Sequence, residues 1–163
     1  MSTSEDLKEA FAGESQANRK YLAFAKKADA EGYAQAAKLF RAAADAETVH
    51  ALAHLKASGG IGSTADNLEE AIGGETFEYT KMYPGMIERA TAEGNNAARM
   101  SFENANAVEQ IHAGLYRKAL DDLGNNTQVD YWVCQVCGNT VEGEPPDKCP
   151  ICGSPKTAFN KID

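Results

Sequence analysis

Long apolar runs are missing from this sequence: across its 163 residues, no stretch reaches the roughly 18 uninterrupted apolar residues that a membrane-spanning helix needs. Positive charge is also scarce, because 16 Lys and Arg stand against 24 Asp and Glu, for a net charge of −8. That balance argues against nucleic acid and anionic membranes as partners. The N-terminus is polar and acidic, so no signal peptide is expected. These absences predict a soluble, cytoplasmic protein.

Cysteine is absent from residues 1–133, and all four cysteines then occur together as Cys134, Cys137, Cys149 and Cys152. They form two Cys-x-x-Cys-Gly knuckles, in which the glycine allows a tight turn that points backbone N–H groups at sulfur. In a secreted chain four cysteines would suggest disulfides, but two tight pairs favour a metal. Four thiolates in a tetrahedron suit either iron or zinc, and the spacing does not choose between them.

The composition changes at the linker Gly124-Asn125-Asn126-Thr127. After it, helical periodicity stops, and cysteine, glycine, proline and β-forming residues take over. The remaining segment is too short for an ordinary core and needs a bound metal to fold. The predicted architecture is therefore mainly α, with a four-helix bundle over residues 1–126 followed by a four-cysteine module over residues 127–163.

Apolar periodicity and glycine breaks predict four long helices before the linker, at residues 3–31, 33–58, 75–93 and 96–123. A short helix that Ser63 or Asp66 can start is expected to run to about Ile72, with the Gly73-Gly74 pair interrupting the chain after it. Pro84 should kink the third long helix or, alternatively, end it and let another begin. The long connection at residues 60–73 favours one crossover between two helix pairs, the ferritin-like arrangement, over simple up-and-down order.

A glutamate followed three residues later by a histidine occurs twice, at Glu47–His50 and at Glu109–His112. On a helix this spacing points both side chains the same way, so both can bind the same ligand. A single copy is common by chance on solvated helices. Here both copies fall on otherwise apolar stripes, where an unpaired carboxylate is costly unless it is neutralised, paired or bound to a cation.

Further inward-facing carboxylates complete a pattern that the two halves of the predicted bundle share. Glu14 lies on the apolar stripe of the first helix, and Glu75 and Glu78 lie on the third. Each half thus supplies a glutamate helix and then a Glu-x-x-His helix. This arrangement predicts a pseudo-twofold site for two metal ions, the pattern of di-iron carboxylate bundles.

With both motif sets in view, the chain resembles the rubrerythrin family over residues 4–163. That family joins a ferritin-like di-iron domain to a rubredoxin-like domain, in which the cysteine tetrad holds one iron. The family pattern falls on Glu14 in Gly-Glu-Ser-Gln-Ala-Asn, on both Glu-x-x-His motifs, and on Glu75 and Glu78 in Gly-Gly-Glu-Thr-Phe-Glu-Tyr-Thr-Lys-Met-Tyr-Pro, with no ligand missing.

The resemblance also implies a role for each ligand. The implied roles are bridging of both irons by Glu47 and Glu109, terminal binding of one iron by Glu14 and Glu78, terminal binding of the other by Glu75 and His112, and replacement of Glu78 by His50 on reduction. Tyr21 and Tyr83 match tyrosines that surround the family's site, although ordinary core packing explains them equally well. His54, one turn beyond His50, is expected to be structural rather than a ligand.

The function that the resemblance implies is the reduction of hydrogen peroxide to water, in defence against oxidative stress. Electrons are expected from an NAD(P)H-dependent, rubredoxin reductase-like donor and pass singly through the four-cysteine iron. In the family that iron serves a neighbouring subunit's site, so a homodimer is expected. Two alternatives stay open: a ferritin-like ferroxidase that sequesters iron, and a metal sensor or interaction protein whose cysteines hold structural zinc.

Overall fold

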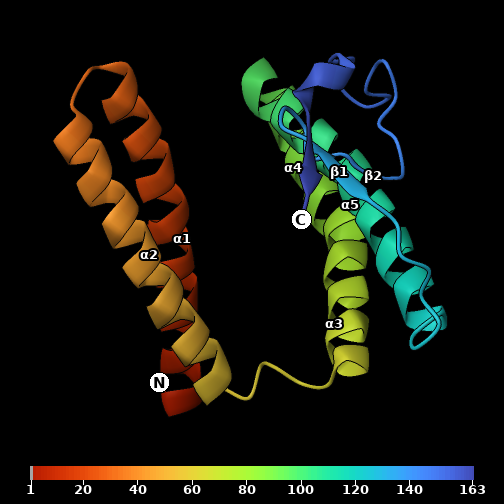
Figure 1. The fold of residues 1–163 in the computed structure, drawn as a ribbon, viewed down its shortest axis with the longest axis horizontal. Coiled ribbons are helices and arrows are strands. Elements are labelled where there is room, and N and C mark those ends of the chain that lie inside the picture. The colour runs from red at the N-terminus through yellow and green to blue at the C-terminus, as the bar shows by residue number, and fades with distance from the viewer. Residues whose placement is uncertain (1) are drawn as a thin grey trace. The chain divides into compact units, whose positions relative to one another are not determined.

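The computed structural model describes residues 2–163 and divides the chain into two compact units, Met1–Gly62 and Ser63–Asp163. The first unit is a helical hairpin, and the second combines helices with a small β-module (Figure 1). The chain is therefore mainly helical and ends in a four-cysteine module, as predicted. Within residues 2–163, none of the helices combines the length and the apolar character that crossing a lipid bilayer demands.

The first unit pairs α1 (Thr3–Ala30) with α2 (Ala34–Ala57) in a hairpin. A capping box starts α1: the Ser2 hydroxyl accepts from the Glu5 backbone N–H at 3.3 Å, and the Glu5 carboxylate accepts from the Ser2 N–H at 2.6 Å. Gly32, with φ of 83°, supplies the left-handed residue that ends α1. Local signals in the sequence thus define both the start of the hairpin and its turn.

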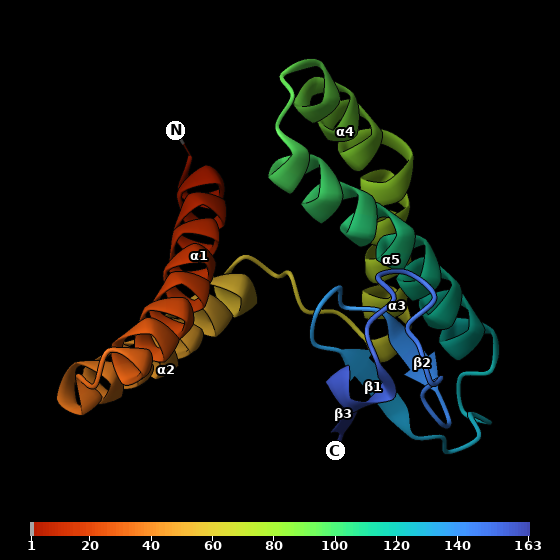
Figure 2. The ribbon, with the colours of Figure 1, turned by 90° about the horizontal axis from the view of Figure 1, so that it is seen from above.

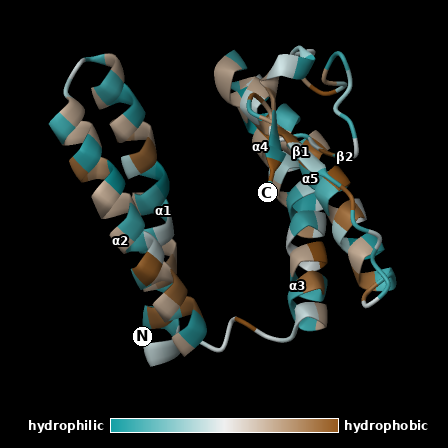
Figure 3. Cartoon of the chain, in the orientation of Figure 1, coloured by the Kyte–Doolittle hydropathy of each residue, from teal (hydrophilic) through white to brown (hydrophobic). Residues whose placement is uncertain are grey.

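Small side chains line the seam between the two helices, and the buried ones are Ala25, Ala28, Ala37, Ala44 and Ala51. Asn18 crosses this seam, because its Nδ2 donates to the Ala44 carbonyl at 2.7 Å and to Thr48 Oγ1 at 2.8 Å. A buried amide with both hydrogens paired favours one register of α1 against α2. Apolar and polar residues are interspersed along both helices (Figure 3).

The second unit begins with one continuous helix in three segments, which a turn joins to a partner helix; the elements are α3 (Thr64–Phe77), the π-helical η1 (Glu78–Met82), α4 (Tyr83–Ala92) and α5 (Asn96–Asp121). The interruption expected at Gly73-Gly74 is therefore wrong, and so is the long connection expected at residues 60–73. Glycine costs about 1 kcal/mol relative to alanine in a helix interior, which weakens a helix without ending it. A capping box between Ser63 and Asp66 starts the helix ahead of the glycines.

Pro84 lies inside this continuous helix. Proline lacks an N–H, and its ring clashes with the carbonyl four residues earlier. The chain accommodates it with a wider π turn, in which the N–H of Tyr83 donates to the carbonyl of Glu78. The disturbance expected at Pro84 thus takes the form of a π turn next to Glu78, one of the predicted ligands.

Three short strands form the C-terminal module, an antiparallel sheet in the order β2-β1-β3 (Figure 2). They are β1 (Tyr131–Cys134), β2 (Thr140–Glu142) and β3 (Phe159–Ile162), with a 3-10 turn, η2 (Lys156–Ala158), before the last. Cys134, Cys149 and Phe159 form the buried core, against which Trp132 packs. The module's core is therefore built around the cysteines themselves.

The module belongs to the same compact unit as the helices that precede it. Strand β2 contacts α5, and the unit runs without a break from Ser63 to Asp163. The domain boundary predicted between residues 126 and 127 falls in the linker that joins α5 to β1. It remains a prediction from composition.

Candidate metal centres

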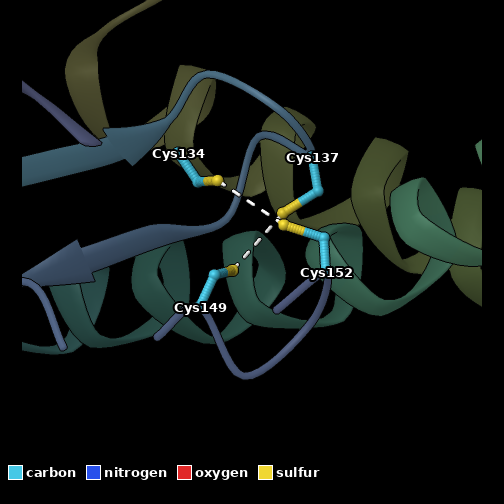
Figure 4. A group of neighbouring side chains, drawn as sticks. All are labelled: Cys134, Cys137, Cys149 and Cys152. Atoms are coloured by element: carbon cyan, nitrogen blue, oxygen red, sulfur yellow. Dashed lines mark hydrogen bonds between the residues drawn. The ribbon is translucent and has the colours of Figure 1, made fainter. Parts of the chain in front are cut away.

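The four cysteines converge from two loops of the C-terminal module, and all are free thiols (Figure 4). Sγ of Cys134 lies 3.7 Å from Sγ of Cys152, and Sγ of Cys137 lies 3.6 Å from Sγ of Cys149. A tetrahedron with metal–sulfur bonds of about 2.3 Å has sulfur–sulfur edges of roughly 3.8 Å. These two edges, with all four sulfur atoms within 4.8 Å of one another, suit one thiolate-bound metal ion.

Hydrogen bonds around the tetrad already favour one thiolate. Burial raises the pKa of the Cys137 thiol. Burial also opposes ionisation of Cys152, but the hydroxyl and backbone N–H of Ser154 and the neighbouring thiols outweigh it and lower the pKa of that thiol to about 6. Ser154 Oγ lies 3.2 Å from Cys152 Sγ. A cation at the centre would offset the charge of the remaining thiolates.

Asn139 is a residue of this site that the sequence analysis missed. It is only 1% exposed, and its Nδ2 donates toward Cys149 Sγ at 3.7 Å. Its Oδ1 has no hydrogen-bond partner within residues 2–163. No local signal marks Asn139, because only the folded module brings its amide to a sulfur of the other knuckle.

The first unit gathers three predicted ligands into one cluster: Glu14 from α1, and Glu47 and His50 from α2. Their ligand atoms lie within 4.8 Å of one another, and His50 Nδ1 is 3.0 Å from Glu47 Oε2. Hydrogen bonds with His50 and then with Glu14 lower the pKa of Glu47. The register of α1 against α2 that Asn18 favours determines the position of Glu14 relative to Glu47 along the helix axes.

The second unit gathers a matching cluster: Glu75 from α3, and Glu109 and His112 from α5. His112 Nδ1 lies 2.8 Å from Glu109 Oε2 and 3.6 Å from Glu75 Oε1. Burial, and then the charge of Glu109, raises the pKa of Glu75. Two carboxylates that disfavour each other's ionisation indicate a place for a cation.

Glu78 lies outside this three-residue cluster but close enough to interact with it. Burial, and then the charge of Glu75, raises the pKa of Glu78. Burial also raises the pKa of Tyr83, and the charges of Glu78, Glu109 and Glu75 add to that effect. Tyr83 is therefore a protonated phenol beside a group of carboxylates.

Two residues of the first unit have more ordinary surroundings. Tyr21 packs in an aromatic cluster with Phe24 and Phe40, with ring centroids 6.3 and 6.2 Å away, which fits the packing alternative raised for it. His54 is half-buried on α2 and belongs to none of the three candidate metal clusters within residues 2–163.

Thr140 of β2 is the second residue that the sequence analysis missed. Its Oγ1 lies 2.9 Å from His112 Nε2, although the two residues are 28 positions apart. A threonine after a cysteine knuckle carries no signal for this contact, because the contact exists only where β2 packs on α5.

The two Glu/His clusters suit the chemistry expected of them. Each offers carboxylate oxygens and one imidazole nitrogen, and each pairs a glutamate with a histidine three residues on, as di-iron carboxylate bundles do. Within residues 2–163, no Lys or Arg forms an ion pair with the carboxylates of the two clusters or with Glu78; these carboxylates are Glu14, Glu47, Glu75, Glu78 and Glu109. The partners of Glu47, Glu75 and Glu109 are the two histidines, so each cluster offers a set of donor groups that could hold a metal ion.

Comparison with known proteins covers both sites. Residues 5–120 match the rubrerythrin family, and residues 132–160 match the rubrerythrin rubredoxin-like domain. Nigerythrin of Nitratidesulfovibrio vulgaris is 38% identical over 97% of this chain and 85% of its own length. Rubrerythrin-2 of Clostridium acetobutylicum is 34% identical over 96% of this chain and 95% of its own.

A solved structure of nigerythrin in a mixed-valent state aligns with a TM-score of 0.60 and 37% identity, covering 99% of this chain and 87% of that one. Another solved structure, of fully reduced, all-ferrous nigerythrin, aligns equally well. Since the sequence matches extend through the helices and the cysteine module alike, this chain belongs to the rubrerythrin family.

Proposed function

We propose that this protein is a non-haem di-iron peroxidase that reduces hydrogen peroxide to water in cytoplasmic defence against oxidative stress. The reaction joins one molecule of peroxide with two electrons and two protons to give two molecules of water. The observation that carries the proposal is the contact between Thr140, in the electron-transfer module, and His112, a predicted di-iron ligand. Iron storage has no use for an electron carrier placed against its metal ligands.

The family's two iron cofactors, a di-iron carboxylate site and a mononuclear four-cysteine site, match the donor groups present. We assign iron binding to the Glu14–Glu47–His50 cluster of the first unit and to the Glu75–Glu109–His112 cluster of the second unit, with Glu78 beside the latter. When bound, the di-iron pair polarises the peroxide oxygens and supplies electrons to them. The ligand roles that the resemblance implies for Glu47, His50, Glu78 and Glu109 are part of this proposal.

Tyr83 is the proton donor that the geometry favours. Its phenol lies near Glu75, Glu78 and Glu109, and burial together with these charges raises its pKa, so it holds its proton at neutral pH. A phenol in that position can donate a hydrogen bond to an oxygen atom as negative charge develops there. The neighbouring carboxylates can then return a proton to it.

Electrons are proposed to come from NAD(P)H through a rubredoxin reductase-like donor. They would enter at the four-cysteine site and leave it one at a time. The packing of β2 on α5 keeps this module beside the Glu75 cluster. A homodimer is also part of the proposal, and sedimentation of the iron-loaded protein tests it.

The test uses the iron-loaded full chain and a double variant, Cys149→Ser with Cys152→Ser. After chemical reduction without oxygen, both proteins are expected to consume peroxide in a single turnover. Only the native chain should sustain NAD(P)H-driven turnover with a rubredoxin reductase, because the variant lacks the thiolate site. Peroxide consumption, NAD(P)H oxidation and iron content are measured together.

Two results would contradict the proposal. Sustained NAD(P)H-driven turnover in the double variant would remove the cysteine site from the electron route. Slow peroxide reduction, with ferrous iron and oxygen consumed while iron accumulates in the protein, would instead support the ferritin-like ferroxidase.

A further inference from the structure

The two ring nitrogens of His112 face different parts of the second unit. Nδ1 points to the carboxylates, 2.8 Å from Glu109 Oε2 and 3.6 Å from Glu75 Oε1. Nε2 points to the C-terminal module and lies 2.9 Å from Thr140 Oγ1. The imidazole therefore stands between a predicted iron site and the strand that follows a cysteine knuckle.

The hydrogen bonds of Thr140 indicate that Nε2 of His112 carries a proton. Thr140 has one hydroxyl hydrogen, and its Oγ1 also lies 3.2 Å from the carbonyl oxygen of Gly138, which can only accept. That hydrogen is therefore directed to Gly138, and the lone pair of Oγ1 faces His112. Nε2 is then the nitrogen that donates to Oγ1, and Nδ1, which lies against the Glu109 carboxylate, is the nitrogen available to a metal ion in place of a proton.

The same groups form a short chain from a cysteine ligand to the imidazole. Gly138 follows Cys137 directly, so two hydrogen bonds lead from the knuckle to the ring: Thr140 donates to the Gly138 carbonyl, and His112 donates to Thr140. An alternating chain of this kind polarises each of its bonds. It also offers an electron a nearly continuous path between the two sites.

Packing around this chain shows that the contact is more than a surface hydrogen bond. A Cβ placed on Gly138 would lie 3.8 Å from Val108 Cγ1, and Val108 is only 2% exposed. Farther along α5, the Lys118 ammonium pairs with Glu142 of β2. The knuckle and β2 thus meet α5 at two points besides Thr140, one on each side of it.

We propose that Thr140 is a positioning residue: its hydroxyl holds His112 in the tautomer that presents Nδ1 to iron and links that ligand to the Cys137 knuckle. The part of this inference that concerns electron delivery rests on the proposed peroxidase function. In that step, an iron held by the cysteine tetrad would give up one electron, becoming ferric, and the di-iron pair would take it up. No covalent bond is made or broken.

The experiment compares the iron-loaded full chain with Thr140→Val, which keeps the shape and loses the hydroxyl, and with Thr140→Ser, which keeps the hydroxyl. Lys118→Ala is the control for loosened docking, because it removes the ion pair without touching His112. Thiolate absorbance reports that the module is folded in each variant, and Thr140→Ala replaces the valine variant if that variant lacks this absorbance.

Three quantities are measured. They are the exchange rate of the His112 imidazole N–H in the ¹⁵N-histidine-labelled, reduced protein, the retention of di-iron against a chelator, and the rate at which the thiolate iron is oxidised after peroxide is added. In Thr140→Val we expect N–H exchange about tenfold faster, and iron retention and electron delivery weakened by about tenfold or more. Thr140→Ser should resemble the native chain, and Lys118→Ala should leave N–H exchange unchanged.

Native N–H exchange and iron retention in Thr140→Val would overturn the proposal. So would a Lys118→Ala variant that reproduces every change, because the contact would then serve docking alone. If no variant or native protein reduces peroxide, yet Thr140→Val still alters N–H exchange and iron retention, the positioning role stands and the peroxidase function fails. If the native protein reduces peroxide normally and Thr140→Val is unaffected, the peroxidase function stands and the positioning role of Thr140 fails.

Discussion

Asn139 directs its amide nitrogen at the sulfur of Cys149, at 3.7 Å. A hydrogen bond to thiolate sulfur stabilises the more negative, reduced state of a bound iron more than the oxidised state, and it therefore raises the reduction potential. The opposite end of the same amide, Oδ1, is buried without a partner in the described chain. A buried polar atom left unpaired is costly, which favours a functional reason for the asparagine.

Replacing Asn139 by leucine is expected to lower the reduction potential of the four-cysteine iron. The loss should be on the order of 50 mV, since a tenfold change in a one-electron equilibrium corresponds to about 59 mV. Spectroelectrochemical titration of the thiolate absorbance measures it. Asn160→Ala, at an exposed position on β3, is the control, and an unchanged potential in Asn139→Leu would show that the amide does not tune the site.

Glu75 and Glu78 predict how the metal-free protein responds to pH. Burial raises the pKa of both carboxyls above the ordinary value of 4.5. A raised folded-state pKa means that the folded protein binds more protons than the unfolded chain, so the stability these groups contribute is present below pH 4.5 and is lost as pH rises through the folded-state pKa.

Chemical denaturation of the metal-free protein between about pH 4.5 and 8 checks this sign. Relative to Glu75→Gln, the free energy of unfolding of the native chain should decrease as pH rises, because the opposite contribution of Cys152, whose pKa is lowered to about 6, is common to both proteins. Iron loading should reverse the trend, because metal binding requires the deprotonated carboxylates. The same dependence of stability on pH in the native chain and in Glu75→Gln would contradict the argument.

At the scale of elements, the helix running from α3 to α4 combines a capping box that favours it with residues that disfavour it. Gly73, Gly74 and Pro84 all argue for interruption, yet the helix continues through them. The π turn at Glu78–Met82 satisfies the backbone where proline cannot donate. Continuity matters for the site, because it keeps Glu75, before the π turn, and Tyr83, after it, on one rigid support.

Ser63→Ala tests how the start of this helix offsets its glycines. The Ser63 hydroxyl accepts from the Asp66 backbone N–H at 3.2 Å, and removal of such a cap costs about 1 kcal/mol of stability. Urea denaturation of the metal-free chain measures the loss. Ser101→Ala, on the exposed side of α5, should change stability little; equal effects of the two substitutions would mean that the cap is unimportant.

At the scale of the whole molecule, the predicted iron ligands are divided between two units. The hairpin of α1 and α2 carries Glu14, Glu47 and His50, and the second unit carries Glu75, Glu109 and His112. The β-module depends on a different source of stability, since its core consists of two metal-ligand cysteines and Phe159. The helices have seams of their own, so loss of each metal should affect a different part of the chain.

Removing the metal from the cysteine site is expected to unfold the β-module while the helices persist. Trp132 is the only tryptophan of the chain and packs against the core of the module, so its emission should shift to the red. Far-ultraviolet circular dichroism should retain the helical signal. Unchanged Trp132 emission after complete metal removal would show that the module folds without its metal.

The sequence by itself indicated the first two helices, the last helix, the residues that the structure gathers into clusters, and the family. Those features depend on short-range spacing, such as Glu47 to His50 on one helical turn or Cys134 to Cys137 in one knuckle, and such spacing can be read from neighbouring residues. It misjudged Gly73-Gly74, because propensity weighs a residue without the capping and packing that surround it.

Only the tertiary structure decided the contacts between distant segments. Thr140 meets His112, and Asn139 meets Cys149, because the folding of the module and its packing on α5 bring those atoms together. No motif or periodicity in the sequence indicates that the residues of these pairs are in contact. Hydrogen-bond geometry is set by positions in space to within a fraction of an ångström, and it is the folded chain that supplies those positions.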